Sequence, residues 1–210
     1  MMAPRRALIV IDPQQEYFTG LLPIQHPSRE ESVQRIADAM DAAAAAGIPI
    51  VMVQHSAGGE APVFNSMTPS FDLHPALEDR ASSTWKRVTK SYSSVFPGTD
   101  IEEWLRAQSL DTITLAGYMT NNCILATAVE AEARGIAVEV LSDATGAIDI
   151  TNAAGSASAA TVHTTLLALL HSNFAAVAST EAWSSAVASG EGLEKSNLVE
   201  SAAAGVAAFA

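Results

Sequence analysis

Three side chains with complementary chemistry stand at or just beyond predicted strands: Asp12, Lys90 and Cys123. A thiol becomes a strong nucleophile when it loses its proton, and a nearby ammonium group or helix start favours the thiolate by its positive charge. A carboxylate can carry that proton and later activate water. Together these residue types could perform nucleophilic catalysis, in which Cys123 attacks, Lys90 lowers the thiol pKa and Asp12 moves the proton.

Each of the three residues also has a purely structural interpretation. A single cysteine often packs in a core as a small apolar side chain. Asp12 could cap the turn that follows its strand, and Lys90 could lie in solvent. Spacing alone leaves both interpretations open.

The predicted secondary structure would bring these three residues together. Short β-branched runs alternate with longer alanine-rich runs, a pattern typical of buried parallel strands joined by helices. We predict strands at 7–12, 48–54, 85–90, 111–117, 137–142 and 174–178, and helices at 28–46, 100–108, 121–134 and 156–172. Right-handed crossovers imply an α/β fold, a doubly wound, mostly parallel six-stranded sheet with helices on both faces. Ligands of such sheets bind outside the carboxyl ends of the strands, where all three residues fall.

The chain length favours one domain with a large core. We assign residues 1–183 to this domain. Residues 184–210 are rich in alanine, serine and glycine, and we expect a tail that is either disordered or packed on a neighbouring subunit. The long connection over 55–84 carries several glycines and prolines, and connections of this length are usually functional. We expect it to form part of a site wall.

Composition excludes several classes of partner. With 23 acidic and 11 basic side chains the formal charge is −12, which would repel a phosphate backbone, so we expect no nucleic acid. No apolar run reaches the roughly 18 to 20 residues that a membrane span needs, and we see no secretory signal. The single cysteine excludes an internal disulfide and favours a reducing cytoplasm.

Four strings resemble, in order and spacing, the isochorismatase-like cysteine hydrolase family, which is related to N-carbamoylsarcosine amidase and nicotinamidase. They are IDPQQEYF at 11–18, KSYSSVFPGTDIEEWL at 90–105, LAGYMTNNCILATAVEAEARG at 115–135 and VLSDATG at 140–146. The resemblance covers about residues 7–183. It implies that Asp12, Lys90 and Cys123 form the family's catalytic triad.

The resemblance also implies the geometry and the reaction of the site. A non-proline cis peptide would join Tyr118 to Met119 and aim the Met119 N–H, beside the Cys123 N–H, at the oxygen that gains charge during attack. The implied reaction is hydrolysis of an amide, imide or carbamoyl C–N bond through a thioester, without a cofactor. Family members are generally oligomeric and the alanine-rich helices offer close-packing faces, so we expect a homo-oligomer, either a dimer or a tetramer.

Two departures from relatives narrow the reaction. Nicotinamidase-like members bind a metal through an Asp-x-His motif, whereas here Val53 stands two residues before His55. A metal site built from His55, His74 and Asp72 matches no strong zinc pattern, so we expect none. Members that cleave the vinyl ether of isochorismate commonly lack the nucleophilic cysteine, so its presence favours acyl chemistry. Ether hydrolysis and a non-catalytic metabolite binder remain the alternatives.

Polar and aromatic side chains beside these strings are the candidates for substrate binding. They carry little charge, so we expect a small, neutral, amide-bearing molecule. The candidates are Gln14, Phe18, Tyr92, Phe96, Tyr118 and Asn122, with Asn121 beside them; core packing is the alternative for Phe18 and Phe96.

Overall fold

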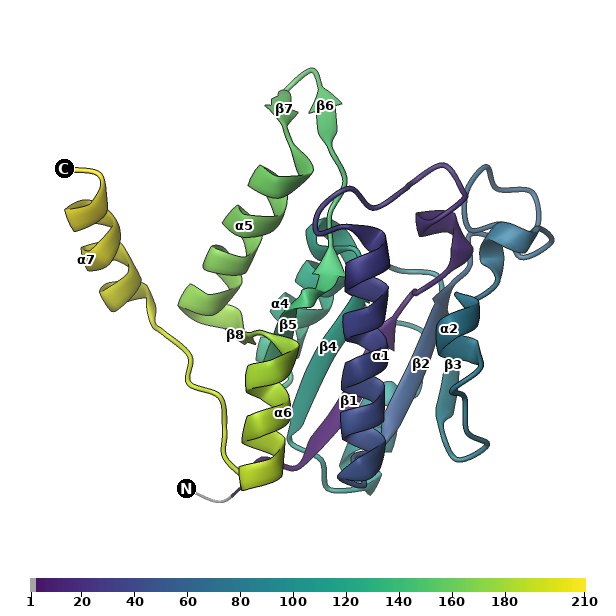
Figure 1. Cartoon of the computed structure of the whole chain (residues 1–210), viewed down its shortest axis with the longest axis horizontal. Coiled ribbons are helices and arrows are strands. Elements are labelled where there is room, and N and C mark those ends of the chain that lie inside the picture. Colours follow the sequence, from purple (N-terminus) through teal and green to yellow (C-terminus); the bar gives the residue numbers. More distant parts are fainter. Residues whose placement is uncertain (1–2) are drawn as a thin grey trace.

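A parallel six-stranded sheet forms the centre of the computed structural model, which describes residues 3–210 (Figure 1). The strand order is β3–β2–β1–β4–β5–β8, and every neighbouring pair is parallel. The strands are β1 (Arg6–Ile11), β2 (Ile50–His55), β3 (Lys86–Lys90), β4 (Thr112–Tyr118), β5 (Ala137–Gly146) and β8 (Ala176–Ala178). The predicted doubly wound sheet is therefore confirmed. Its order reverses between β1 and β4, the point at which such sheets bind ligands.

Helices cover both faces of the sheet and bury alternate residues of each strand. The helices α1 (Arg29–Ala45) and α6 (Thr180–Ser189) lie on one face. On the other face lie α3 (Ile101–Ala107), α4 (Leu125–Ala133) and α5 (Ala159–Leu169). Each face of the sheet has its own hydrophobic core. In β1, Leu8 packs into the core on the side of α1 and Ile9 into the core on the side of α4, which explains the unbroken apolar run of this strand. Within residues 3–210, no helix is both long and apolar enough to cross a bilayer.

Several short elements fall where the sequence predicts loops or a longer helix. A hairpin of β6 (Ile150–Asn152) and β7 (Gly155–Ala157) replaces the predicted start of the helix at 156. The helix α5 begins only after Ser158, whose hydroxyl caps it by accepting the Thr161 N–H. The other short elements are η1 (Gln15–Tyr17), η2 (Pro69–Phe71), α2 (Pro75–Glu78), η3 (Thr120–Ile124) and η4 (Leu170–Phe174).

The predicted domain boundary after residue 183 falls inside α6 (Thr180–Ser189). Ser179 caps this helix by accepting the Ala182 N–H at 3.2 Å, and Trp183 is fully buried. Residues 184–189 therefore belong to the domain. Within the predicted tail, α7 (Leu198–Ala208) is helical and projects from the body (Figure 1).

The strands β1 and β4 approach very closely at Gly117, next to the switch point. A Cβ atom at this position would lie 2.1 Å from the carbonyl oxygen of Ile11, and φ is +101°. Only glycine has both the space and the backbone freedom for this contact. The close approach sets how near the chain leaving β1 lies to the chain leaving β4.

Candidate active site

The carboxyl ends of three strands bring Asp12, Lys90 and Cys123 into one cluster. Asp12 follows β1, Lys90 ends β3, and Cys123 lies in η3, which follows β4. The Nζ atom of Lys90 lies 2.7 Å from Oδ2 of Asp12 and 3.2 Å from Sγ of Cys123. The three residues are 0%, 1% and 3% exposed in that order. The strand order thus places the three predicted residues in contact, away from solvent.

The backbone at Asp12 turns sharply as it leaves β1. Its φ is +50°, a left-handed value that few residues other than glycine adopt, although aspartate and asparagine tolerate it. The Asp12 N–H donates to the Val53 carbonyl at 3.0 Å and so fixes the turn. Neither carboxylate oxygen has a well-aligned hydrogen bond, despite the ion pair with Lys90. Burial raises the pKa of Asp12, while Lys90 opposes the rise. The carboxylate is therefore available as a proton acceptor, and a stronger one than an exposed aspartate.

The ammonium group of Lys90 has more acceptors than protons. Besides Asp12 and Cys123, its Nζ lies 3.0 Å from the carbonyl oxygen of Tyr92 and 3.1 Å from Nδ1 of His55. An ammonium carries three N–H donors, so these four acceptors compete for three protons. The thiol is the weakest acceptor of the four when it is protonated. Lys90 is thus held mainly by Asp12, Tyr92 and His55.

His55 is a site residue that the sequence analysis considered only as a metal ligand. It ends β2 and pairs in register with Lys90 of β3. Burial and the charge of Lys90 lower the pKa of His55 to about 4. The ring is therefore neutral at pH 7, and the contact with Lys90 assigns the lone pair to Nδ1. The position of a histidine at the carboxyl end of the strand between β1 and β3 is the signal that could have identified it.

The surroundings of Cys123 favour the protonated thiol, contrary to the expected lowering of its pKa. Burial raises the pKa of Cys123 to about 12, the negative charge of Asp12 adds to the rise, and Lys90 only partly offsets it. The expectation counted the favourable charges near the sulfur and left out the loss of solvation. A thiol in this state must give up its proton during the reaction.

The peptide bond between Tyr118 and Met119 is cis, as the resemblance implies. The carbonyl of Met119 accepts the N–H groups of Asn122 at 3.1 Å and Ile124 at 3.3 Å, and so folds the chain into η3, a short π-helical turn. The backbone N–H groups of Met119 and Cys123 both belong to this turn. Their role as an oxyanion hole stays a prediction.

Comparison with known proteins identifies the family. A family model described as the isochorismatase domain matches residues 6–182. The chain belongs to the isochorismatase family. A crystal structure of a candidate isochorismatase from Burkholderia xenovorans LB400 is 46% identical, covers 99% of each chain and superposes with a TM-score of 0.96.

Two curated relatives of this isochorismatase-family chain bear names that state more. A maleamate amidohydrolase from Pseudomonas putida is 32% identical over 152 residues, which cover 67% of this chain and 71% of that protein. A secreted isochorismatase effector from Verticillium dahliae is 34% identical over 143 residues, 68% of this chain and 73% of that protein.

Three of the six predicted substrate-binding side chains have partners within the protein. The side-chain amide of Gln14 forms hydrogen bonds to the backbone: its oxygen accepts the His55 N–H at 2.8 Å and its nitrogen donates to the Phe71 carbonyl at 2.9 Å. The buried Tyr118 hydroxyl lies 2.7 Å from the hydroxyl of Ser32. Their polar groups are already hydrogen-bonded within the protein, and substrate binding by Gln14 and Tyr118 stays a prediction.

Phe96 is the third of these side chains. It packs in the core beneath the site, with the Arg134 guanidinium 4.8 Å from its ring centre. Core packing was the alternative given for this residue, and the structure supports that alternative.

The other three candidates also stay predictions. Phe18 is partly exposed and packs against the ring of His74 at 4.4 Å. Tyr92 and Asn122 are exposed. The contribution of Tyr92 that the structure shows directly is its backbone carbonyl, which accepts from Lys90.

Tyr17 is a second site residue that the sequence analysis did not name. Its ring is buried 5.5 Å from that of Phe64. Burial raises the pKa of its phenol, and the nearby Asp12 carboxylate adds to the rise. Tyr17 therefore lies close to the cluster. Asn121 buries its Oδ1 atom without a hydrogen-bond partner in the same turn as Cys123.

The three residues considered for a metal site do not gather around a common point. His55 turns its Nδ1 atom to Lys90, and Nδ1 of His74 accepts the Ala76 N–H at 3.3 Å. Asp72 is exposed. Over residues 3–210, no three His, Cys, Asp or Glu side chains are arranged to hold an ion.

Replacing Asp12 and Lys90 should shift the thiol pKa in opposite directions. Asp12 raises the pKa of Cys123 and Lys90 lowers it. At a fixed alkaline pH, Asp12→Asn should therefore speed alkylation of the thiol by iodoacetamide several-fold, and Lys90→Met should slow it. Asparagine is chosen because it also tolerates a positive φ. Because Cys123 is the single cysteine, alkylation rates measured against pH report on it alone. Shifts of the same sign in both variants would contradict this electrostatic assignment.

Proposed function

We propose that this chain is a cysteine hydrolase that cleaves an amide, imide or carbamoyl C–N bond of a small molecule through a thioester. The observation that carries the proposal is the buried cluster in which Lys90 contacts both Asp12 and Cys123. It joins a nucleophile, a cation and a proton acceptor, the parts that covalent acyl transfer requires. A relative named maleamate amidohydrolase supports chemistry at a C–N bond.

The first step follows from the protonation states. Burial favours the protonated thiol, and the oxygens of the neighbouring Asp12 carboxylate lack well-aligned hydrogen bonds. The thiol proton therefore passes to Asp12 as Sγ forms a bond with the substrate carbonyl carbon. The carbonyl electron pair moves to oxygen. The N–H groups of Met119 and Cys123 stabilise this oxyanion.

The Lys90 ammonium group exchanges one hydrogen-bond partner for another during that step. A thiolate is a charged acceptor and binds an ammonium proton more strongly than a thiol does. As Sγ gains charge, Lys90 directs a proton to it and releases its contact with His55. His55 thus acts as a positioning residue, which holds the ammonium 3.2 Å from the sulfur before the reaction begins.

The remaining steps return the site to its starting state. Asp12 gives its proton to the leaving nitrogen, the C–N bond breaks and the thioester forms. Water then attacks the thioester carbon and gives a proton to Asp12, the C–S bond breaks, and the sulfur regains the proton. One water and one amide become one acid and one amine or ammonia. These steps require no cofactor.

The surroundings of the cluster favour a small neutral substrate. Tyr17, Phe64 and the neutral His55 ring pack around it, and Asp12 and Lys90 balance each other's charge. A nucleophilic cysteine must also stay reduced, which favours a cytoplasmic location.

Replacing Cys123 by alanine should abolish hydrolysis. A panel of small amides, imides and carbamoyl compounds, assayed for release of ammonia or amine, should first identify a substrate. On that substrate kcat/KM should fall by on the order of 10³-fold or more, as for other nucleophile deletions. The exposed Met67→Ala variant is the control, and circular dichroism should show both variants folded.

Other outcomes of this test favour the alternative functions. Isochorismate hydrolysis that survives in Cys123→Ala would favour an ether hydrolase. Binding without turnover across the panel would favour a metabolite-binding protein.

Replacing His55 should test its positioning role. His55→Leu removes the third acceptor of Lys90, so kcat should fall by roughly tenfold, about 1.4 kcal/mol in barrier, while KM stays near the wild-type value. His55→Asn keeps an acceptor near the position of Nδ1 and should restore most of kcat. The rates are measured across pH, because a merely structural role would leave the pH profile unchanged. Equal kcat in the wild type and His55→Leu would reject the role.

A further inference from the structure

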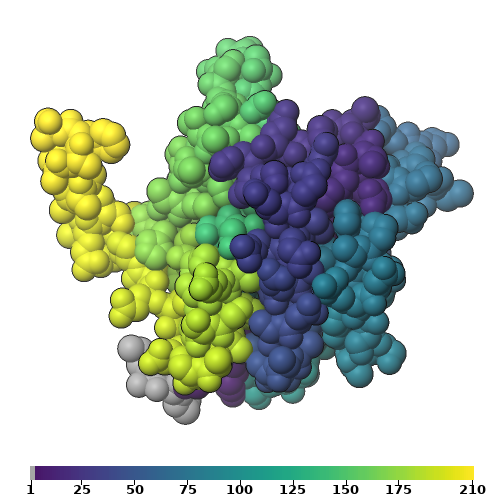
Figure 2. Space-filling view, viewed as in Figure 1, coloured from purple at the N-terminus to yellow at the C-terminus, as the bar shows by residue number. Residues whose placement is uncertain are grey.

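The helix α7 (Leu198–Ala208) projects from the body of the molecule, and we call residues 197–210 the C-terminal arm (Figures 1 and 2). Across the described chain α7 has no buried residue, and its main contact is with η4. Its large apolar side chains face solvent: Leu198 is 60% exposed, Val199 80%, Val206 73% and Phe209 94%. Such clustered exposure marks a docking surface.

These side chains form a stripe that points away from the body. Val199, Val206 and Phe209 are spaced at i, i+7 and i+10, which places them on one face of a helix. The less exposed positions Ser201 and Gly205 lie on another face. Glu200 is the single charged side chain of the arm. The stripe therefore requires an apolar, uncharged partner.

The arm needs such a partner to keep its conformation. The helix α7 has 11 residues, and isolated helices shorter than about 12 to 15 residues are marginal in water. The Burkholderia structure superposes over 99% of both chains with a TM-score of 0.96, so its arm follows the same course. A projecting helix that keeps its course in two proteins of 46% identity favours a contact outside its own chain as the support for that course.

We infer that the arm packs on a second copy of this chain, in a reciprocal two-fold exchange. A stable interface uses about 20 to 30 residues on each side. The arm has 14 residues, about half that number. In a two-fold exchange each copy both gives an arm and accepts one, so both surfaces count on each side and the interface reaches the required size.

The face of α4 and α5 is the acceptor that the structure offers. Val129 on α4 and Leu169 on α5 are exposed apolar side chains. Both helices contact η4, the segment that α7 also contacts, and Figure 2 shows an open hollow between the arm and α5. The residues of α5 include no Asp, Glu, Lys or Arg. A nearly uncharged arm on the uncharged α5 limits like-charge repulsion between two chains of charge −12, and the acidic side chains of this face, Glu130 and Glu132, come from α4.

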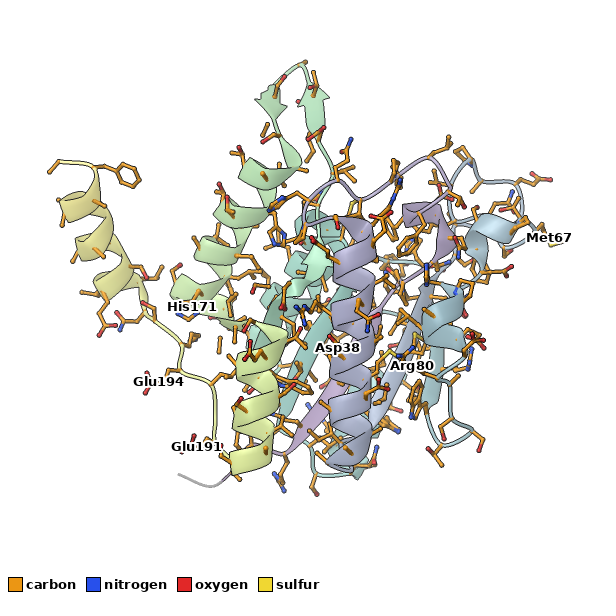
Figure 3. The ribbon with its side chains drawn as sticks, viewed as in Figure 1. Asp38, Met67, Arg80, His171, Glu191 and Glu194 are labelled. Carbon is orange, nitrogen blue, oxygen red and sulfur yellow. The ribbon has the colours of Figure 1, made fainter. Side chains whose placement is uncertain are left out.

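Sedimentation equilibrium of the full chain tests the inference. The wild type should have at least twice the chain mass of 21.9 kDa, and Val206→Glu/Phe209→Glu should have 21.9 kDa. Leu21→Glu/Met67→Glu adds the same charge at exposed apolar positions and should stay assembled; Met67 lies on the side of the molecule away from the arm (Figure 3). Leu169→Glu places a charge on the acceptor face and should also dissociate the assembly.

Hydrogen exchange of the α7 amides gives an independent readout. These amides should be protected in the wild-type assembly and exchange rapidly in Val206→Glu/Phe209→Glu, while those of the sheet stay protected in both. A wild type of 21.9 kDa, or an arm variant that stays assembled, would overturn the exchange. Protection that appears only on added phosphatidylcholine vesicles would identify a membrane as the occupant and also overturn it. Assembly that survives Leu169→Glu would overturn the assigned acceptor.

Discussion

A carboxylate and an ammonium group that share a site without solvent are the constraint on which this structure depends. Asp12 and Lys90 lie 2.7 Å apart, and both side chains are fully buried. Burying two ions costs several kcal/mol each, and their attraction offsets this only when further partners satisfy them. Tyr92 and His55 provide such partners for Lys90. The carboxylate oxygens of Asp12 lack well-aligned hydrogen bonds. The carboxylate can therefore accept a proton, a role that goes beyond stabilising the fold.

The sheet explains how so unfavourable an arrangement is held. Asp12 follows β1 and has a positive φ, and Lys90 ends β3, two strands away. His55 ends β2, which lies between these two strands. The contact of Gly117 with the Ile11 backbone brings the other side of the site, the turn with Cys123, against the same point. An apolar cluster of similar volume would stabilise the fold at least as well. We therefore interpret the ion pair as a device for moving one proton to and from sulfur.

The sheet and the three central residues could be predicted because their signals are local. The run ALIVID is long enough to identify a strand buried on both faces, and the rule for parallel sheets then gathers Asp12, Lys90 and Cys123 at one edge. The helix α6 was missed because its Ala- and Ser-rich sequence resembles that of the tail, and the burial of Trp183 depends on packing against distant elements.

The parts of the site that no local pattern reveals depend on contacts between distant segments. The amide of Gln14 stands beside a catalytic string, but its partners His55 and Phe71 lie 41 and 57 residues away. The pKa of Cys123 was predicted with the wrong sign because the charges nearby can be inferred from strand ends, whereas the depth of burial cannot. The lysine contact of His55 depends on the register of β2 and β3, which no local pattern shows.

The most direct measurement of the central claim is the mass of the protein during a single turnover. The enzyme is mixed with a confirmed amide substrate, quenched in acid and digested. Our account predicts that the acyl part of the substrate is attached to the peptide that contains Cys123, and that Cys123→Ala shows neither the adduct nor the product. Product formed by Cys123→Ala at the wild-type rate, or an acyl group attached to another residue, would contradict it.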